Sequence, residues 1–554
     1  MQTLRSVDVS RTEWRWVIIL SGFLVALALL PYAWALARNE SDDDWQFMGM
    51  LSNPKDGATY LSKIEQGSQG AWLFELRHTP EEHNGAIFHS FYLMLGHLTY
   101  LTGLSTRVVF HLARVATSLF MYFSIYQLGA TVWVRLRPRR LFFTLMAVGS
   151  GLGWFLLLFT SDVLAVDMTI PEAFPFLSAY TNPHFPLSIA ALCLIAATYM
   201  VAFRRGFKAE PTAENGGLAL IIYSMLLALI QPPALIPIGA TLGVYVVVRY
   251  YITREFPVHE LRWAAMLWLP AIPFAIYDIA VFQFNDIMGE FNAQNQTPSP
   301  PPYLYLFGYG LLLVVAIPGL IRAIRRFERD GDQLMLIWIV VNVIALYVPF
   351  NLQRRLAIGL IIPLVYFAVR ALEDYWFYQV GEKWRAPAMI ALIVFVVPTN
   401  VLNLVIPLFG VVGNTDSGLE FGLIIETDYW ESFKWLESHG EEDAVALAAP
   451  NVSMWLPAYT QQLVVYGHEF ETVPAEERRE QVEAFYRGQD CTTLLGDSLP
   501  FTVRYVFWGP QEQEMREDDD GVIYPDAGKC IDELPPDRIE EEVTHGEVTI
   551  FIIQ

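Results

Sequence analysis

The feature that most limits what this chain can fold into is a series of long apolar runs. Of its 554 residues 54% are hydrophobic and 17% are charged, and the apolar residues recur in runs of about 17–25, the length that crosses about 30 Å of hydrocarbon as a helix. We therefore predict a polytopic α-helical membrane protein with about eleven transmembrane helices. The expected spans are residues 16–37, 106–134, 141–160, 184–203, 217–231, 234–250, 261–282, 303–321, 333–350, 355–372 and 387–409.

Arginine and lysine gather in the loops between alternate spans, as at residues 135–140, 204–208 and 322–329. Such loops stay in the cytoplasm. With eleven spans, all of these clusters share the side of the N-terminus, so we predict a multi-pass protein of the cell (inner) membrane with a cytoplasmic N-terminus. Residues 86–104 are apolar enough to cross, but a crossing there would move the later arginines outside. We predict an interfacial or re-entrant helix instead.

The C-terminal residues 414–554 differ in composition from the rest. They hold 31 Asp and Glu against 8 Lys and Arg, which accounts for the net charge of −22. Short elements alternate here, which predicts an extracytoplasmic α/β domain, separate from a membrane domain over 1–413 that includes an outer loop at 38–105. The expected helices are 429–438 and 475–487, and the expected strands are 444–449, 463–466, 503–508 and 548–553.

This tail contains no evident catalytic group, so we interpret it as a lid or an acceptor-binding domain. Cys491 and Cys530 could pair outside the cytoplasm, and two free thiols are the alternative. The chain has no basic groove, which excludes a nucleic-acid partner.

The outer loop 38–105 holds the strongest candidate for chemistry. Asp56 precedes Tyr60 by four residues, which places both on one face of a helix. A carboxylate there can act as a general base or help hold a divalent cation; the plainer interpretation is an acid that stabilises a helix N-terminus. Asp43 and Asp44 form a second acidic site, which could bind a cation such as Mg²⁺ or Mn²⁺ or simply cap the first membrane helix.

Three features follow the first span. They are an outer loop with Asp-x-x-x-Tyr, an apolar helix ending in Leu-Thr-Gly-Leu-Ser, and a helix that opens with Arg107 and Arg114. In these features the chain resembles the C-type (GT-C) membrane glycosyltransferases, nearest to the protein mannosyltransferase and aminoarabinose transferase branch. The resemblance implies that Asp56 and Tyr60 match the family's Asp-Glu-x-x-Tyr motif, with Asp56 as the catalytic carboxylate. Gly57 stands where that motif has Glu, and the Trp-Trp-Asp signature of oligosaccharyltransferases is absent.

Further substrate-binding candidates lie in later outer loops. Arg354 and Arg355 fall at the outer end of two spans, where the positive-inside rule disfavours them, and a lipid phosphate gripped by guanidinium groups explains their presence. Snorkelling to lipid headgroups is the alternative. The resemblance also implies an acid from the second outer loop, where Asp162, Asp167 and Glu172 are available and Glu172 is our candidate. His184 at a helix start is a candidate for binding substrate, and a structural helix cap is the alternative. We expect 294–302 to form a flexible outer loop.

These features predict a membrane glycosyltransferase that moves a sugar from a polyprenyl-phosphate donor to a lipid, glycan or protein acceptor, with inversion at the sugar and Asp56 as general base. Two other classes remain open. A transporter or flippase of lipid-linked sugars predicts charges buried mid-span and inverted repeats. A non-enzymatic assembly protein predicts that Asp56 is dispensable.

Overall fold

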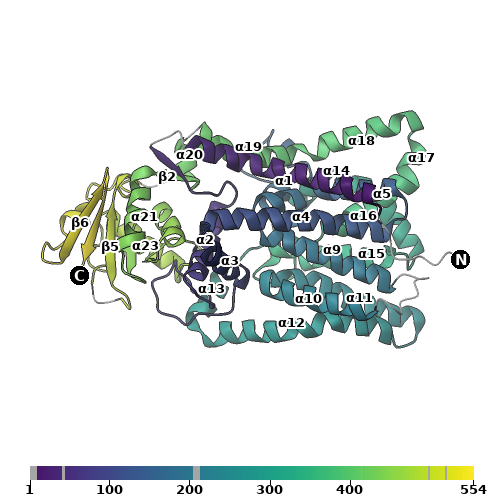
Figure 1. The fold of residues 1–554 in the computed structure, drawn as a ribbon, viewed down its shortest axis with the longest axis horizontal. Helices are drawn as coiled ribbons and strands as arrows, with labels where there is room; N and C mark the ends of the chain where they lie inside the picture. The colour runs from purple at the N-terminus through teal and green to yellow at the C-terminus, as the bar shows by residue number, and fades with distance from the viewer. Residues whose placement is uncertain (1–8, 40–43, 204–212, 414, 497–498, 518–520) are drawn as a thin grey trace. The chain divides into compact units, whose positions relative to one another are not determined.

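The computed structural model describes residues 9–39, 44–203, 213–413, 415–496, 499–517 and 521–554 (Figure 1). Its internal contacts divide the chain into two compact units. Unit 1 comprises Met1–Leu30, His111–Asp278 and Gln296–Ile406. Unit 2 comprises Pro31–Phe110, Ile279–Asn295 and Pro407–Gln554.

Unit 1 is built from long apolar helices. Eight helical segments of the described residues are long and apolar enough to cross a membrane, which confirms a polytopic helical membrane protein. They contain α1 (Arg11–Asn39), α4 (Thr106–Val132), α9 (His184–Phe203), α11 (Leu235–Thr253), α12 (Val258–Phe284), α14 (Pro302–Arg326), α16 (Ile361–Ala371), and α18 (Glu382–Val396) with α19 (Pro398–Val412).

The other three predicted spans correspond to helices that are shorter than these eight segments. Two are apolar helices, α10 (Ala213–Ile230) and α15 (Asp332–Ala345), and the third is α5 (Leu136–Val148). Helix α5 ends where the predicted span was to continue, because extended backbone at Gly149 stops it. Short segments join the long helices: α6 (Gly153–Leu156), α7 (Val166–Thr169), η1 (Pro171–Ala173), α8 (Pro175–Tyr180), η2 (Pro232–Ala234), η3 (Gln353–Ala357), η4 (Leu372–Trp376) and α17 (Phe377–Gln379).

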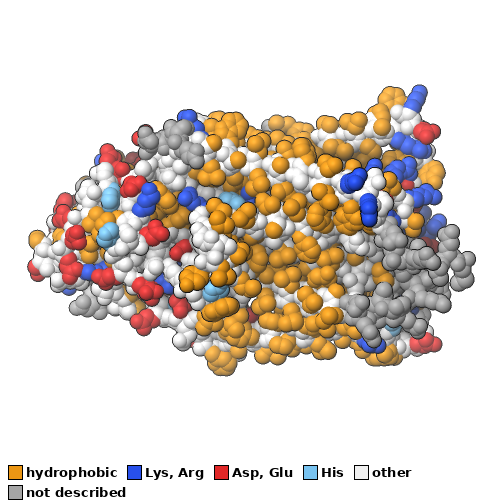
Figure 2. Space-filling model, in the orientation of Figure 1, with side chains coloured by type: hydrophobic (Ala, Val, Ile, Leu, Met, Phe, Trp, Pro, Cys, Tyr) orange, Lys and Arg blue, Asp and Glu red, His pale blue; other side chains and the backbone are white. Residues whose placement is uncertain are grey.

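The surface of unit 1 is suited to hydrocarbon. On the face in Figure 2, hydrophobic side chains cover α4, α10 and α12, while Lys and Arg gather near α5 and α17. Only 6% of the most apolar window of Val258–Phe284 is buried inside the protein. A helix that is apolar on nearly every side and still exposed belongs in lipid.

The first part of unit 2 is a pair of helices in the predicted outer loop. Helix α2 (Pro54–Ser68) packs closely on α3 (Ser90–Thr102), which lies within the predicted interfacial segment. With 13 residues, α3 is about 20 Å long, which is too short to cross a bilayer. A third helix, α13 (Asp286–Gln294), also belongs to this unit.

The second part of unit 2 is the C-terminal α/β fold, as predicted. Its five-stranded sheet has the order β4-β3-β5-β7-β6, in which β3 runs parallel to β4 and β5, and β7 runs antiparallel to β5 and β6. The strands are β3 (Val445–Leu447), β4 (Leu463–Val464), β5 (Val503–Trp508), β6 (Ile539–His545) and β7 (Val548–Ile553). The helices are α20 (Thr415–Glu420), α21 (Thr427–His439), α22 (Pro450–Tyr459), α23 (Ala475–Tyr486), α24 (Pro510–Glu514) and α25 (Lys529–Asp532).

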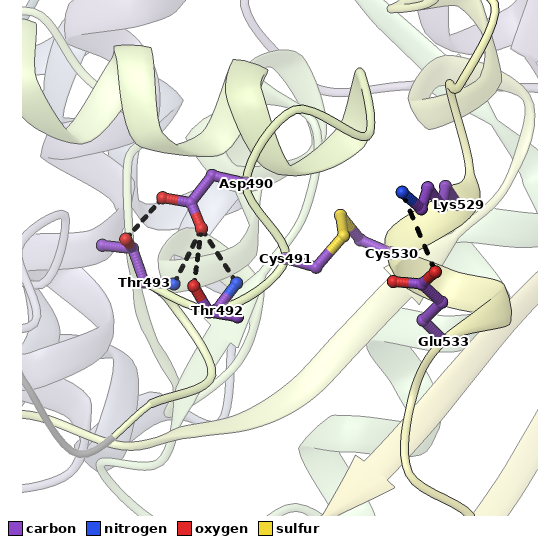
Figure 3. The surroundings of a disulfide bond; sticks show 7 residues. All are labelled: Asp490, Cys491, Thr492, Thr493, Lys529, Cys530 and Glu533. Atoms are coloured by element: carbon purple, nitrogen blue, oxygen red, sulfur yellow. Dashed lines mark hydrogen bonds and ion pairs between the residues drawn. A yellow bond between two sulfur atoms is a disulfide. The ribbon is translucent and has the colours of Figure 1, made fainter.

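The predicted outer loop and the tail share one compact unit. Strand β1 (Trp45–Phe47) pairs antiparallel with β2 (Ile424–Glu426), and α2 packs against α22. Cys491 and Cys530, for which the sequence left two possibilities open, form a disulfide (Figure 3). The domain boundary expected at 413 and 414 stays a prediction.

Candidate functional site

Asp56 lies on a helix, as its spacing from Tyr60 predicted, and falls in the first turn of α2. Pro54 opens the helix and Asn53 caps it in a left-handed conformation, with its side-chain amide donating to the Asp56 carboxylate. The Asp56 side chain is 25% exposed, so a substrate can reach it. Tyr60 follows one turn later but is buried, and its ring stacks on Tyr92 of α3 at 4.3 Å between centroids. The four-residue spacing therefore places the accessible carboxylate of Asp56 one helical turn before the buried ring of Tyr60.

The carboxylate of Asp56 faces a histidine from the tail. Nε2 of His468 lies 3.6 Å from Oδ1 of Asp56, and the His468 side chain is 3% exposed. The other ring nitrogen, Nδ1, accepts hydrogen bonds from the backbone N–H groups of Phe470 and Glu471, at 3.1 and 3.2 Å. An N–H group can only donate, so in the neutral ring the proton sits on Nε2, on the side of Asp56.

A buried ion pair lies behind this contact. Nζ of Lys63, two turns after Asp56 on α2, donates to Glu471 and to Thr59. Burial alone would raise the pKa of Glu471, but Lys63 and the neighbouring histidines outweigh burial and hold that pKa well below its ordinary value of 4.5. Burial lowers the pKa of His78, whose Nδ1 lies 3.7 Å from Glu471. Glu471 therefore stays ionised at neutral pH.

Several hydrogen bonds hold residues 467–473 in place. Thr472 Oγ1 accepts from the N–H groups of Gly467 and His468 and donates to the carbonyl of His78. The side-chain amide of Gln294 donates to the carbonyls of Phe470 and Thr472. The segment thus presents His468 from a fixed backbone.

Sequence reasoning missed this contribution of the tail. Lys63 had a readable signal, because it lies on the face of α2 that carries Asp56 and Tyr60. His468 and Glu471 are about four hundred residues away along the chain, as the separation of 408 between Lys63 and Glu471 shows. A single sequence gives no local pattern for such a contact.

Unit 1 holds the remaining predicted substrate-binding residues. Glu172 in η1 and His184 at the start of α9 are buried, and the half-buried Arg354 and Arg355 lie in η3. The segments η1 and η3 contact one another, and Tyr305 of α14 interacts electrostatically with both Glu172 and Arg354. The structure therefore brings Glu172 and this arginine into one region of unit 1.

Backbone hydrogen bonds to Thr297, in the loop predicted at 294–302, hold the start of η3 and with it Arg354. The N–H of Arg354 donates to the carbonyl of Thr297 at 2.9 Å, and the N–H of Thr297 donates to the carbonyl of Asn351 at 2.7 Å. Part of the loop predicted at 294–302 is thus tied by backbone hydrogen bonds.

Two further residues of the second outer loop have distinct surroundings. Asp167 accepts from the N–H groups of Gly151 and Gly153, at 2.9 and 3.3 Å, and so has a structural role. Asn182 is fully buried, and neither atom of its side-chain amide has a hydrogen-bond partner among the residues described. A buried amide without a protein partner is typical of a group that meets water or a ligand.

Comparisons with known proteins identify the fold. No protein-family model and no curated protein matches the sequence. Among solved structures, the chain is similar to ArnT from Cupriavidus metallidurans bound to undecaprenyl phosphate, with 13% identity, a TM-score of 0.52 and 98% of each chain covered. ArnT in the apo state gives 12% identity and a TM-score of 0.51 over 98% of each chain.

The Archaeoglobus fulgidus oligosaccharyltransferase in complex with Zn and sulfate is also similar, with 13% identity and a TM-score of 0.51 over 89% of this chain and 68% of that one. The chain has the GT-C fold. Both relatives are GT-C membrane glycosyltransferases, which agrees with the resemblance seen in the sequence.

The metal site predicted at Asp43 and Asp44 stays a prediction. Within the described ranges, no group of three or more His, Cys, Asp or Glu side chains could hold a metal ion. Asp43 lies outside those ranges, and the carbonyl of Asp44 accepts from the N–H of Thr427 at 3.0 Å.

Proposed function

We propose that the protein is an integral membrane glycosyltransferase that transfers a sugar from a polyprenyl-phosphate donor to an acceptor at the extracytoplasmic face. The observation that supports this most is the similarity in fold to ArnT over 98% of both chains, combined with an accessible acid at Asp56. One ArnT structure was solved with undecaprenyl phosphate bound, so a polyprenyl phosphate is the natural first candidate for the lipid carrier here.

The proposed reaction is a single displacement at the anomeric carbon. Asp56 takes the proton of the acceptor's hydroxyl or amine while the acceptor attacks the sugar. The bond from the anomeric carbon to the phosphate oxygen breaks, and polyprenyl phosphate leaves with the bonding electrons. Attack opposite the leaving group inverts the configuration.

Charge on the leaving phosphate requires cationic partners. We assign this role to Arg354 and Arg355, because guanidinium groups bind phosphate oxygens in a bidentate way and stabilise charge that develops in the transition state. Glu172 and His184 would bind polar groups of the substrate. Tyr60 is buried against Tyr92, and we propose that this packing, one turn after Asp56, helps to hold Asp56 in place.

The disulfide in the tail supports the proposed orientation. Disulfides persist outside the cytoplasm, so the Cys491–Cys530 bond favours an extracytoplasmic tail in a cell (inner) membrane protein with a cytoplasmic N-terminus. The acceptor would then be a lipid, glycan or protein on that side.

The test is turnover of purified protein with polyprenyl-phosphate sugars, followed as release of polyprenyl phosphate. We expect Asp56→Asn to lower kcat by about 100-fold or more, the usual contribution of a general base. Glu442→Gln, a change at an exposed acid of the tail, is the matched control and should leave turnover unchanged. Equal rates for wild type and Asp56→Asn would refute the catalytic assignment. No turnover with any such donor would favour a flippase or an assembly protein.

A further inference from the structure

We propose that His468 is a positioning residue for Asp56. It donates a hydrogen bond from Nε2 to the carboxylate and thereby fixes the orientation of the base. This inference rests on the proposed function, because it assigns a role to a side chain that acts through Asp56. The chemistry would then depend on the C-terminal domain as well as on the outer loop.

The hydrogen bonds of the imidazole determine the direction of this interaction. Two backbone N–H groups, from Phe470 and Glu471, point at Nδ1, so a proton at Nδ1 would meet two donors. Nε2 keeps its proton and directs it at Asp56, 3.6 Å away. Catalytic hydrogen bonds are often long in a free enzyme and shorten when substrate binds. A shift of about 0.5 Å would bring this contact into the range of a hydrogen bond.

The surroundings of His468 are rigid, which a positioning residue requires. The ring is nearly fully buried, and its backbone N–H donates to Thr472 Oγ1. Three residues later, Glu471 is anchored to Lys63. Since Lys63 and Asp56 belong to the same helix, α2 both carries the base and receives the segment that orients it.

Other described groups around Asp56 occupy different positions. Asn53 occupies the other carboxylate oxygen, Oδ2. On the exposed side Lys55 lies 4.0 Å from Glu469, with both side chains more than half exposed. Tyr92 of α3 interacts electrostatically with Asp56, while His78 and the pair of Lys63 and Glu471 lie close to His468. Removing His468 therefore removes the N–H group that faces Oδ1 of Asp56.

Kinetics of His468 variants test the proposal. We expect His468→Ala to lower kcat by about 10- to 100-fold, with less than about a twofold change in the donor's KM. We also expect the acid limb of the kcat/KM profile to move to higher pH, because a carboxylate that loses a donor holds its proton more tightly. His468→Gln keeps an N–H near the position of Nε2 and should restore most of kcat and the wild-type profile. The control is His439→Ala, at an exposed histidine of α21.

The outcomes separate this inference from the proposed function. If Asp56→Asn abolishes turnover while His468→Ala keeps the wild-type kcat and pH profile, the positioning role is refuted and the proposed function stands. If Asp56→Asn turns over normally, the proposed base itself is refuted. If the His468→Ala variant does not fold, a comparison of His468→Gln with His468→Met tests the proposal instead. The two side chains have similar length, and only that of Gln can donate a hydrogen bond. Equal kcat in these two variants would overturn the proposal, and a slower Met variant would support it.

Discussion

Lys63 is a buried charge on the helix that carries the proposed base. Its side chain is 1% exposed and its partner Glu471 is 8% exposed. The ammonium group also lies 5.1 Å from the ring centroids of Tyr60 and Phe74. A charge in such surroundings is tolerated only when it is paired. The pair therefore fixes where the tail segment 467–473 meets α2.

We expect Lys63→Met to destabilise unit 2 by about 3–5 kcal/mol, because it leaves Glu471 buried without its cation. Hydrogen exchange should show the result as about 100-fold or faster exchange of the amides in 467–473. The folded-state pKa of Glu471 is depressed, so the stabilisation is present above about pH 4.5 and is lost as the pH falls through the folded-state pKa.

The exposed pair of Lys55 and Glu469 is the control for this prediction. It spans 4.0 Å with side chains 60% and 53% exposed, so Lys55→Met should change stability by less than about 1 kcal/mol. A double variant with Lys63→Met and Glu471→Leu should recover part of the loss, because no charge is then left unpaired. Equal effects of Lys63→Met and Lys55→Met would contradict the interpretation.

At the level of residues, the sequence predicted only what a local pattern can encode. The four-residue spacing of Asp56 and Tyr60 placed both on one helix face, and the structure agrees. The contacts of Asp56 with His468, and of Lys63 with Glu471, depend on how two distant segments fold together. No periodicity or motif near Glu471 signals that a lysine of the outer loop will neutralise it.

Helices α2 and α3 approach one another through glycines. A Cβ at Gly96 would lie 2.1 Å from the carbonyl oxygen of Ile64, and a Cβ at Gly67 would lie 2.1 Å from the carbonyl oxygen of Leu93. Both distances are far below van der Waals contact, and both obstacles are backbone atoms that cannot rotate away. This close approach sets the position of α2, and with it that of Asp56.

We predict that Gly96→Ala destabilises the protein by about 1–3 kcal/mol, because the added methyl group forces the two helices apart. The unfolding temperature should fall, and kcat should fall with it as α2 moves. Alanine is otherwise the better helix former by about 1 kcal/mol, so the effect opposes the intrinsic preference.

Gly22 in α1 provides the comparison for Gly96. A Cβ there meets nothing within 4 Å, so Gly22→Ala should leave stability unchanged or raise it slightly. An increase in unfolding temperature for Gly96→Ala would show that the helices can separate without cost.

Individual elements were predictable where the pattern was strong. The strands expected at 503–508 and 548–553 are β5 and β7 with the predicted bounds. Strand β6 was missed because it contains three successive glutamates, Glu540, Glu541 and Glu542. It lies at the edge of the sheet, where charged side chains are common because they discourage pairing with other chains. Its pairing with β7 could not be inferred from composition.

At the level of the whole molecule, the sequence predicted the class of protein but not the composition of its compact units. Apolar runs defined a helical membrane protein because their length is set by the thickness of the bilayer. The grouping of the outer loop with the tail involves the packing of α2 on α22 and the pairing of β1 with β2, strands of only three residues each. Segments that short have no sequence signature.

The tail is the part of the molecule whose compartment can be tested most directly. In Figure 3, Asp490, the residue before Cys491, accepts hydrogen bonds from Thr492 and Thr493, and these lower its pKa to about 2. The local turn is thus held independently of the bond between Cys491 and Cys530, which are separated by 39 positions. Closing a loop of that length is worth about 4 kcal/mol in the chain-entropy account.

We therefore expect a Cys491→Ser, Cys530→Ser double variant to lose about 2–4 kcal/mol of stability. In protein isolated from membranes and denatured without reductant, a thiol reagent should add one mass increment, at Cys193 of α9, which is the free cysteine. Prior reduction should raise this to three increments, and Cys193→Ala should give none before reduction. Three increments without reductant would mean that the bond does not form in the cell, and would remove the support it gives to an extracytoplasmic tail. Because the tail supplies His468, the same result would weaken the case for chemistry at the outer face.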